Sequence, residues 1–547
     1  MLDGVLFLIV MTAALSLAAL ARRRDVQPSL IIVTLAGAAS FVPWIPRFEL
    51  DPDTILGLVL PPLLFAATRG FAVTHFLRNL RPIAGLGIGL VVVTGVVSGF
   101  AASWVVPGLS LSAAMVLGAV VSPPDTVTIV THGRRLGMSQ RVVAILTGEC
   151  LVNDAAALTM FAVTVATVTA TDTFIDGPVL LYLYDTAVGV AIGILLGVVT
   201  NAIRRRLGDA SLATAIGLIL PFSAYLVAEH LHASGVLAVV AAGFSMSLGS
   251  TRLDYETRLR EDHTWFTIDS LLETFVFAYM GMQVSAVVSE VRASGYDETA
   301  VLVAGVVLLA VVIAIRPAAV FMLFGQHRLA RRLRGRVSAR SNRKPRGRRR
   351  VPVPLTVKDN IVVSWTGMRG IVTLAAAGGI PLTTVSGAPF EGRPVIQAIA
   401  FIVAIGTLLI QGSSLPWLIR TLDIDDSVER HRESEALVAA DGVAQEAART
   451  VLTRRAVQAA ESGDGDSALV RLVEAYLDRD AADTRTLDAD DRRVTRQLIA
   501  LWHEVADAQR EALLQQWRAG EIEEAAMRTT MNRIDLRQAS IEAAEPH

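Results

Sequence analysis

The sequence predicts an all-α polytopic membrane protein with thirteen transmembrane helices and a C-terminal helical tail. Of its 547 residues, 52% are hydrophobic and only 18% are charged, and the mean hydropathy is +0.50. A soluble protein of this length carries more charge. Apolar blocks recur as far as Ile419, most of them within the roughly 17 to 25 residues that a bilayer crossing needs. The basic residues alternate between the loops, which supports the count.

The expected spans share a continuous apolar character, and they are 3–20, 29–45, 54–68, 82–106, 111–131, 142–170, 178–202, 211–231, 234–249, 265–289, 299–324, 359–382 and 395–419. The first block resembles a signal peptide in length. It lacks a basic start, however, and its arginines follow the apolar run. We therefore interpret it as the first span.

The connecting loops predict the orientation. Alternate loops carry 27 basic residues and the intervening loops carry 3. Because basic loops stay on the cytoplasmic side, the N-terminus is expected outside and the C-terminus inside. The expected domains are a transmembrane domain over 1–420 and a cytoplasmic tail over 421–547. The tail has 27 acidic and 16 basic side chains with helical periodicity, so a regulatory or stabilising appendage and an inactive solvated tail both remain open.

The loop 327–350 is strongly basic, with 11 Arg, one Lys and no acidic residue. A basic cluster beside a membrane indicates a topology determinant or a contact with anionic lipids, and docking of the acidic tail is an alternative. No aromatic residue interleaves the charges, so nucleic acid is not an expected partner. The one cysteine, Cys150, excludes an intramolecular disulfide and a multi-cysteine metal site. No cofactor is expected.

Two of the expected spans contain helix breaks. The first is interrupted by Ser122-Pro123-Pro124-Asp125-Thr126. Prolines remove amide donors and release carbonyls, which the membrane tolerates only where they line a cavity or a site. Carbonyl oxygens beside Asp125 and Thr126 suit a small hard cation. The second break is Gly-rich and holds Arg369. Breaks at matching offsets predict two inverted six-helix repeats with crossed, unwound helices.

The apolar stretch LTGECLVNDAAALTMF, residues 146–161, carries Glu149, Asn153 and Asp154. At about 100° per residue, Glu149 and Asn153 share a face, and Asp154 points elsewhere. We expect Glu149 to pair with Arg369, because Arg offers a two-pronged donor that stays charged. Asp154 has no comparable partner and can bind a proton or a cation.

Two further intramembrane charges, Glu273 and Arg316, are secondary candidates, and we expect them to pair with each other. A structural role in the contact between helices is the favoured interpretation of this pair.

Five separated motifs resemble a known family. They are LPPLLFAA (60–67), SPPDTV (122–127), GECLVNDAAAL (148–158), FVFAYMGMQ (275–283) and GMRGIVTLA (367–375). In this order they are similar to bacterial sodium/proton antiporters of the monovalent cation–proton antiporter family, relatives of the sodium/hydrogen exchangers. The similarity spans nearly the whole membrane part. It implies a multi-pass protein of the bacterial inner (plasma) membrane that exchanges cations for protons and contributes to pH homeostasis.

The resemblance also implies roles for individual residues. A homodimer would be built from a dimerisation domain and a mobile core domain. Asp154 would be the shared ligand of the cation and the proton, with Asp125 close by. Asn153, where an electrogenic branch has a second aspartate, would mark electroneutral exchange. Glu149 and Arg369 would form a stabilising ion pair.

The chain departs from the family pattern at two places. Cys150 stands where the family has Ser, and a thiol is a poor ligand for Na⁺ or K⁺. The first break reads Pro124-Asp125-Thr126 instead of Thr-Asp-Pro. The Pro124 carbonyl remains available, but the hydroxyl moves to Thr126. Either change is expected to alter ion preference.

The leading hypothesis is electroneutral exchange of Na⁺, K⁺ or Li⁺ for H⁺ by alternating access, with the cation and H⁺ competing for Asp154. A K⁺-selective K⁺/H⁺ antiporter of the same fold and a passive cation channel are the alternatives. An aspartyl protease would use Asp125 and Asp154 as a dyad sharing one proton. That chemistry leaves Asn153, Glu149 and the paired breaks unexplained, so no enzymatic activity is expected.

Overall fold

The computed structural model describes residues 2–24, 27–43, 54–69, 73–125, 138–171, 175, 177–251, 253–338, 355–422, 427–461 and 492–542. Over these residues the protein is helical, apart from turns, extended connections and one isolated bridge between Thr383 and Pro389. The contacts divide it into two compact units. The first contains 1–207, 215–250 and 264–425, and the second contains 208–214, 251–263 and 426–547.

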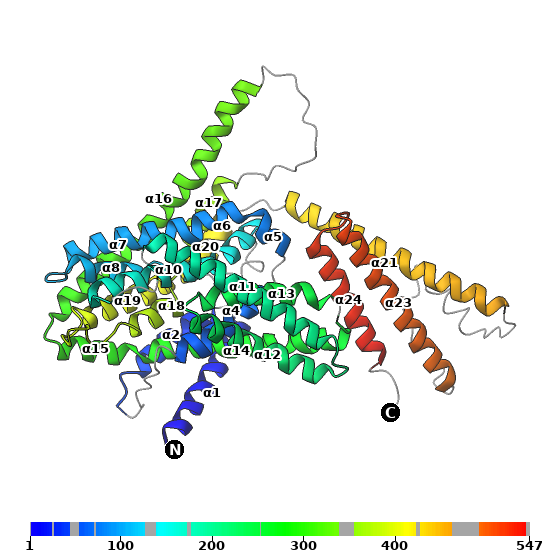
Figure 1. Ribbon diagram of the computed structural model, residues 1–547, viewed down its shortest axis with the longest axis horizontal. Helices are drawn as coiled ribbons and strands as arrows, with labels where there is room; N and C mark the ends of the chain where they lie inside the picture. Colours follow the sequence, from blue (N-terminus) through cyan, green and yellow to red (C-terminus); the bar gives the residue numbers. More distant parts are fainter. Residues whose placement is uncertain are drawn as a thin grey trace. The chain divides into compact units, whose positions relative to one another are not determined.

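The helices up to the tail (Figure 1) are α1 (Leu2–Arg23), α2 (Pro28–Ala39), η1 (Ile55–Val59), α4 (Leu60–Arg69), α5 (Val73–Arg78), α6 (Leu80–Ala84), η2 (Gly85–Leu90), α7 (Val91–Val105), α8 (Leu111–Val121), α10 (Gln140–Thr169), α11 (Pro178–Arg204), α12 (Ala210–His230), α13 (Gly235–Ser250), α14 (Tyr255–Met282), α15 (Val284–Ala293), α16 (Glu298–Ser338), α17 (Val357–Trp365), α18 (Ile371–Gly378), α19 (Arg393–Thr407), η3 (Leu408–Gly412) and α20 (Ser413–Leu422).

Seven helical segments in the described chain are long and apolar enough to cross a membrane: 80–105, 141–169, 178–204, 210–230, 255–293, 298–324 and 393–422. Four shorter apolar helices lie at 28–39, 55–69, 111–121 and 235–250. The expected span 265–289 differs from the structure at its start, because α14 begins ten residues earlier, at Tyr255.

Polar residues begin several of the apolar helices. At the start of α8 the Ser110 hydroxyl accepts a hydrogen bond from the Ala113 amide. Ser139 caps α10 in the same way. Thr356 and Asp359 form a reciprocal capping box at the start of α17. These side chains satisfy amides that have no partner in the first turn of a helix.

Glycines line the contact between α11 and α13 in the first unit. Gly189, Gly193 and Gly197 repeat every fourth residue on α11 and face α13. A methyl group on Gly193 would lie 2.1 Å from the Ala238 carbonyl oxygen. This spacing of small residues lets two membrane helices approach backbone to backbone, so α11 and α13 pack as one pair.

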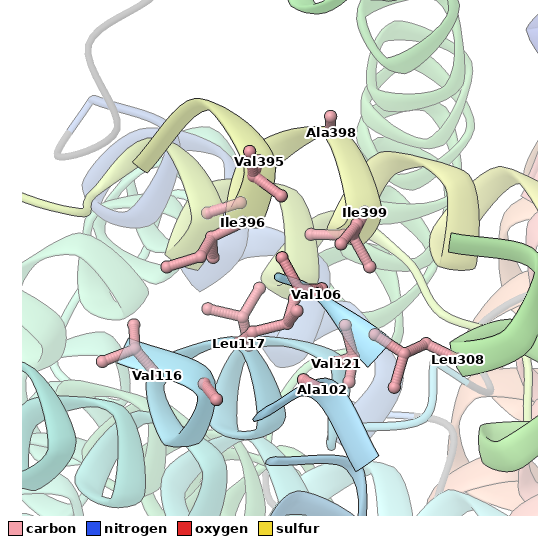
Figure 2. Packing of buried hydrophobic residues seen from close by; sticks show 14 of the residues in the cluster. Ala102, Val106, Val116, Leu117, Val121, Leu308, Val395, Ile396, Ala398 and Ile399 are labelled. Carbon is pink, nitrogen blue, oxygen red and sulfur yellow. The ribbon is translucent and has the colours of Figure 1, made fainter. Parts of the chain in front are cut away.

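Apolar packing joins the first broken helix to the rest of its unit. Figure 2 shows side chains of α7, α8, α16 and α19 meeting in one cluster. Leu117, Leu308, Ile396 and Ile399 are fully buried within it. Close packing of this kind fixes the end of α8 in place, which positions the residues that follow Val121.

The second unit is built around the tail. Its helices α21 (Ser427–Glu461), α23 (Arg492–Arg518) and α24 (Glu524–Glu542) lie side by side (Figure 1) and bury Ala444, Leu513, Met527 and other apolar side chains. The unit also includes 208–214 and 251–263. α14 is therefore shared: its first turns belong to the second unit and its remainder to the first.

Candidate functional site

The two helix breaks predicted from the sequence meet in the structure. α8 ends at Val121 and the chain continues without regular structure through Asp125. α17 ends at Trp365, and α18 begins at Ile371, after an irregular stretch of five residues. The Asp125 amide donates to the Met368 carbonyl at 2.6 Å. A backbone amide of one break thus forms a hydrogen bond with a backbone carbonyl of the other, as burial in a membrane requires.

Asp125 packs against the start of α18. A methyl group on Gly370, the N-cap residue of α18, would lie 1.6 Å from the Asp125 Oδ2 atom. Only a residue without a side chain fits there. The carboxylate lies at the positive end of the α18 dipole, where a negative charge is favourable.

Arg369 places a positive charge at the C-terminal end of α8. Its Nε donates to the Val121 carbonyl at 3.0 Å, and its Nη1 donates to the Gly367 carbonyl. Its own amide donates to the Thr407 hydroxyl at 2.9 Å. A cation at a helix C-terminus is favourable and satisfies an otherwise open carbonyl. Each broken helix end is thereby compensated by a charge from the other break.

The prediction that Glu149 forms an ion pair with Arg369 is wrong. Glu149 is fully buried and accepts two hydrogen bonds from Arg316, at 2.6 and 2.8 Å. Arg316 also donates its Nε to the Val363 carbonyl at 2.9 Å. The reason is that carbonyl oxygens at the breaks engage the Arg369 guanidinium, whereas α16 presents the fork of Arg316 to Glu149.

The expected Glu273–Arg316 pair is wrong for the same reason, because the Arg316 fork is taken by Glu149. Glu273 lies on α14, one turn after Asp269, and the charges of Asp125 and Arg22 also act on it. The Arg22 Nη2 donates to the Ser270 hydroxyl at 2.8 Å. Sequence reasoning missed Asp269, although its four-residue spacing from Glu273 was a usable signal.

Asn153 joins α10 to the first break. It is fully buried, and its Nδ2 donates to the Pro124 carbonyl. Its Oδ1 is buried and has no hydrogen-bond partner among the described residues. A buried polar atom without a partner is costly in an apolar interior. The Pro124 carbonyl keeps its second lone pair, so both oxygens can serve a ligand.

Asp154 follows directly and is only 5% exposed. Within the part of the chain that the structure describes, it makes no hydrogen bond or ion pair. It lies close enough to Asp125 for the two charges to interact. Cys150 is buried one turn before it on α10. Thr126, the remaining expected ligand, lies outside the described residues.

The arrangement offers oxygen ligands to a small cation. Carboxylates of Asp125 and Asp154, the Asn153 Oδ1 and the Pro124 carbonyl are hard donors of the kind that alkali cations prefer. Of the four charged groups at the breaks, Glu149 is neutralised by Arg316. Asp125 and Arg369 neutralise the partial charges at helix ends. Asp154 is the remaining carboxylate, and it neither pairs with an arginine nor neutralises a helix end among the described residues.

Comparisons with known proteins agree with one another. A family model described as "Sodium/hydrogen exchanger, transmembrane" matches residues 8–421. An uncharacterized Na⁺/H⁺ exchanger of Mycobacterium tuberculosis is 28% identical over 98% of this chain and 97% of its own length. An uncharacterized Na⁺/H⁺ exchanger of Escherichia coli is 32% identical over 79% of each chain.

A similar fold is found among solved structures. The sodium proton antiporter MjNhaP1 from Methanocaldococcus jannaschii superimposes with a TM-score of 0.59 at 16% sequence identity. The match covers 77% of this chain and 98% of the antiporter. At this identity the likeness concerns the fold.

Proposed function

Because the chain belongs to the sodium/hydrogen exchanger family, we propose that it is an electroneutral antiporter in which one Na⁺ and one H⁺ compete for Asp154. The observation that carries this proposal is the position of Asp154: buried between two broken helices, without a cationic partner among the described residues. The membrane location and the exchange of cations for protons follow from the family.

Competition follows from charge. The ionised Asp154 carboxylate supplies the negative field that holds a cation, with oxygens of Asp125, Asn153 and Pro124 completing the shell. A proton on Asp154 removes that field and releases the cation. Ion and proton therefore occupy the same carboxylate in turn.

The charge balance supports a ratio of one to one. Glu149 pairs with Arg316, and the charges of Asp125 and Arg369 compensate the ends of broken helices. The neighbour of Asp154 is the neutral Asn153. One uncommitted carboxylate carries either one monovalent cation or one proton, so a transport cycle moves no net charge.

The wider architecture belongs to the same proposal. The site would open to each side in turn as the core domain moves against a dimerisation domain. Thirteen spans in two inverted repeats would place the N-terminus outside and the C-terminus inside. Two copies would form a homodimer, and the basic loop 327–350 would contact anionic lipids.

The alternatives differ in a measurable way. A K⁺-selective exchanger of the same fold would use the same carboxylate with a different cation. A passive channel would conduct cations without moving protons. Neither alternative changes the part given to Asp154 as the cation ligand, so the test must vary the cation and follow the proton.

The test uses everted membrane vesicles with an acid interior and a pH-sensitive dye. Na⁺, K⁺ and Li⁺ are added separately to wild type, to Asp154→Asn and to Asp185→Asn. Asp185 is a matched control, because this half-buried carboxyl of α11 already accepts a hydrogen bond from Thr159 at 3.1 Å.

We expect a cation to dissipate the gradient in wild type and in the Asp185 variant, but not in Asp154→Asn. Exchange by folded Asp154→Asn at the wild-type rate would disprove the assignment. The cation that acts at the lowest concentration identifies the physiological ion.

A further inference from the structure

Buried polar atoms gather at the contact between α2 and η3. Gln27 is the N-cap residue of α2, but its side chain does not cap the helix. Its Oε1 atom instead reaches η3: a methyl group added to Gly412 would lie 3.3 Å from this oxygen. The same methyl group would lie 3.2 Å from the Met368 Sδ atom. The Gln27 amide therefore lies at η3, close to the second helix break.

The glutamines on the two sides of this contact have unsatisfied polar atoms. Both polar atoms of Gln27 are buried and have no hydrogen-bond partner among the described residues, and the same is true of the Gln411 Oε1 atom. Gln411 belongs to η3 and is only 1% exposed. Protein interiors leave few polar atoms unsatisfied, and a group of them indicates an ordered water or an ion. Gln27 and Gln411, which we call the α2–η3 site, therefore indicate a polar ligand.

Hydroxyl groups hold the wide turn of η3 in shape. The Ser413 hydroxyl donates to the Leu409 carbonyl, and the Ser414 hydroxyl donates to the Ile410 carbonyl, both at 2.5 Å. The indole N–H of Trp365 donates to the Ser414 hydroxyl at 2.8 Å. Turns of this π type inside helices occur frequently at functional sites. The turn is thus stabilised without the two glutamine amides, which remain available to a ligand.

η3 is connected to the second helix break by two further contacts. The Arg369 amide donates to the hydroxyl of Thr407, the residue directly before η3, at 2.9 Å. The Met368 sulfur lies beside Gly412, and the Met368 carbonyl accepts the Asp125 amide at 2.6 Å. Met368 therefore contacts both η3 and the backbone of the first break. The α2–η3 site adjoins the place where the two breaks meet.

The α2–η3 site offers neutral oxygen ligands. Alkali cations prefer hard oxygen donors, and the carbonyl oxygens of glutamine amides are of this kind. Neither of the two side chains carries a charge, so dipoles and retained water would hold an ion there. Ions move through a protein only where binding is strong enough for entry and weak enough for release. The ligand set therefore suits brief binding of a partly hydrated monovalent cation.

The neighbouring sequence places the site on the side that we expect to be cytoplasmic. Arg22, Arg23 and Arg24 shortly precede Gln27, and basic loops stay on the cytoplasmic side. η3 is followed by α20 and then by the acidic tail. A cation that approaches Asp154 from the cytoplasm would therefore meet the α2–η3 site first.

We propose that Gln27 and Gln411 form a transit site that binds a partly hydrated monovalent cation between the cytoplasm and Asp154. The inference rests on the proposed exchange function and adds to it a second cation site, made of neutral ligands. The site opens to the cytoplasm when α2 and η3 separate, and the two amides then bind the ion and its water.

The test is the reactivity of introduced cysteines in everted vesicles, whose outer face is the cytoplasmic one. Gln27→Cys and Gln411→Cys are treated with a methanethiosulfonate that carries a trimethylammonium group. We expect both variants to react. Na⁺, K⁺ or Li⁺ at about twice its dissociation constant should slow the reaction about threefold, whereas choline should not. Wild type gives the background, because its Cys150 is buried.

Leu415→Cys is the matched control. Leu415 lies one turn after Gln411, is likewise 1% exposed and packs within an apolar cluster, so this variant should not react. Equal reaction of Leu415→Cys would overturn the proposal, as would an absence of reaction at both glutamine positions. Reaction that no alkali cation slows would also overturn it, because the contact would then hold water only.

A transport measurement provides a second test if a cysteine disturbs folding. Gln411→Leu keeps a side chain of similar size but removes the oxygen. It should raise the KM for the cation about fivefold and leave the maximal rate within about twofold of wild type. A lower maximal rate with an unchanged KM would contradict the proposal.

The labelling separates this inference from the role given to Asp154. The cysteine reactions are repeated in the Asp154→Asn background, where we expect no exchange but the same reaction and the same slowing by cations. Exchange by Asp154→Asn would overturn the proposed function and leave the labelling unchanged. Loss of labelling or of its slowing by cations would overturn the transit site alone.

Discussion

At the residue scale, the two buried arginines Arg316 and Arg369 have different partners, whereas the sequence predicted that Arg369 would pair with Glu149. Arg316 neutralises Glu149, and Arg369 satisfies carbonyls at the helix breaks. Spacing along α10 placed Glu149 on a defined face but could not say which arginine faces it. That depends on how α16 is rotated, and rotation is set by packing with distant helices. Composition and spacing predicted the charged residues, and tertiary structure selected the partners.

The pairing predicts the result of a double-mutant cycle. Arg316→Met leaves the Glu149 carboxylate buried without its partner, which should lower the free energy of unfolding by roughly 3 to 5 kcal/mol. Adding Glu149→Met should recover much of that loss. Thermal unfolding in detergent measures both effects. A parallel cycle of Arg369→Met with Glu149→Met is the control, and a larger coupling energy there would contradict the observed pairing.

The contact between Gly370 and Asp125 gives a second prediction. Gly370→Ala introduces a methyl group 1.6 Å from the present position of the Asp125 carboxylate oxygen. The displaced carboxylate should reduce exchange by about tenfold or more, because a small misplacement at a site is costly. Gly89→Ala is the control, since nothing lies within 4 Å of the added methyl. Equal rates in dye-based exchange assays would show that Asp125 needs no fixed position.

At the element scale, local chemistry made the breaks predictable and long-range contacts made other boundaries unpredictable. Two consecutive prolines disrupt a helix wherever they occur, so the end of α8 could be read directly. The start of α14 could not. Residues 255–264 are rich in charge and look like a loop, but Arg258 finds its partner in Asp535, far along the chain.

The start of α12 carries a pH-dependent cap. The amides of Leu212 and Ser211 donate to the Asp209 carboxylate and hold its pKa below the ordinary value. A lowered pKa in the folded state means that the cap stabilises the helix above the pKa of the unfolded chain. The stabilisation is lost as pH falls through the lowered pKa.

Asp209→Ala should therefore speed hydrogen exchange at Ser211 and Leu212 severalfold at neutral pH. The difference should vanish in strong acid, where wild type has lost its charged cap. Asp209→Asn retains an acceptor that does not titrate, so its protection should not depend on pH. An effect of Asp209→Ala that persists unchanged in acid would indicate that the carboxylate charge is unimportant.

At the scale of the whole molecule, the sequence predicted an all-helical membrane protein of this family, and the family match and the solved antiporter fold support that prediction. It also separated a membrane part from an acidic tail. The sequence could not predict that residues 208–214 and 251–263 pack with the tail in one unit. Residues 251–263 lie between two expected spans, and only the folded chain brings Tyr255 and Arg258 to α23 and α24.

The burial of Cys150 has a practical consequence. The natural chain contains one thiol, and that side chain is 5% exposed on α10. Water-soluble maleimide or spin-label reagents will therefore react chiefly with cysteines introduced at chosen surface positions. Pairs of labels on exposed residues of different helices can report distances by pulsed electron resonance without first removing a native cysteine. The protein is already suited to spectroscopic tracking of its own motions.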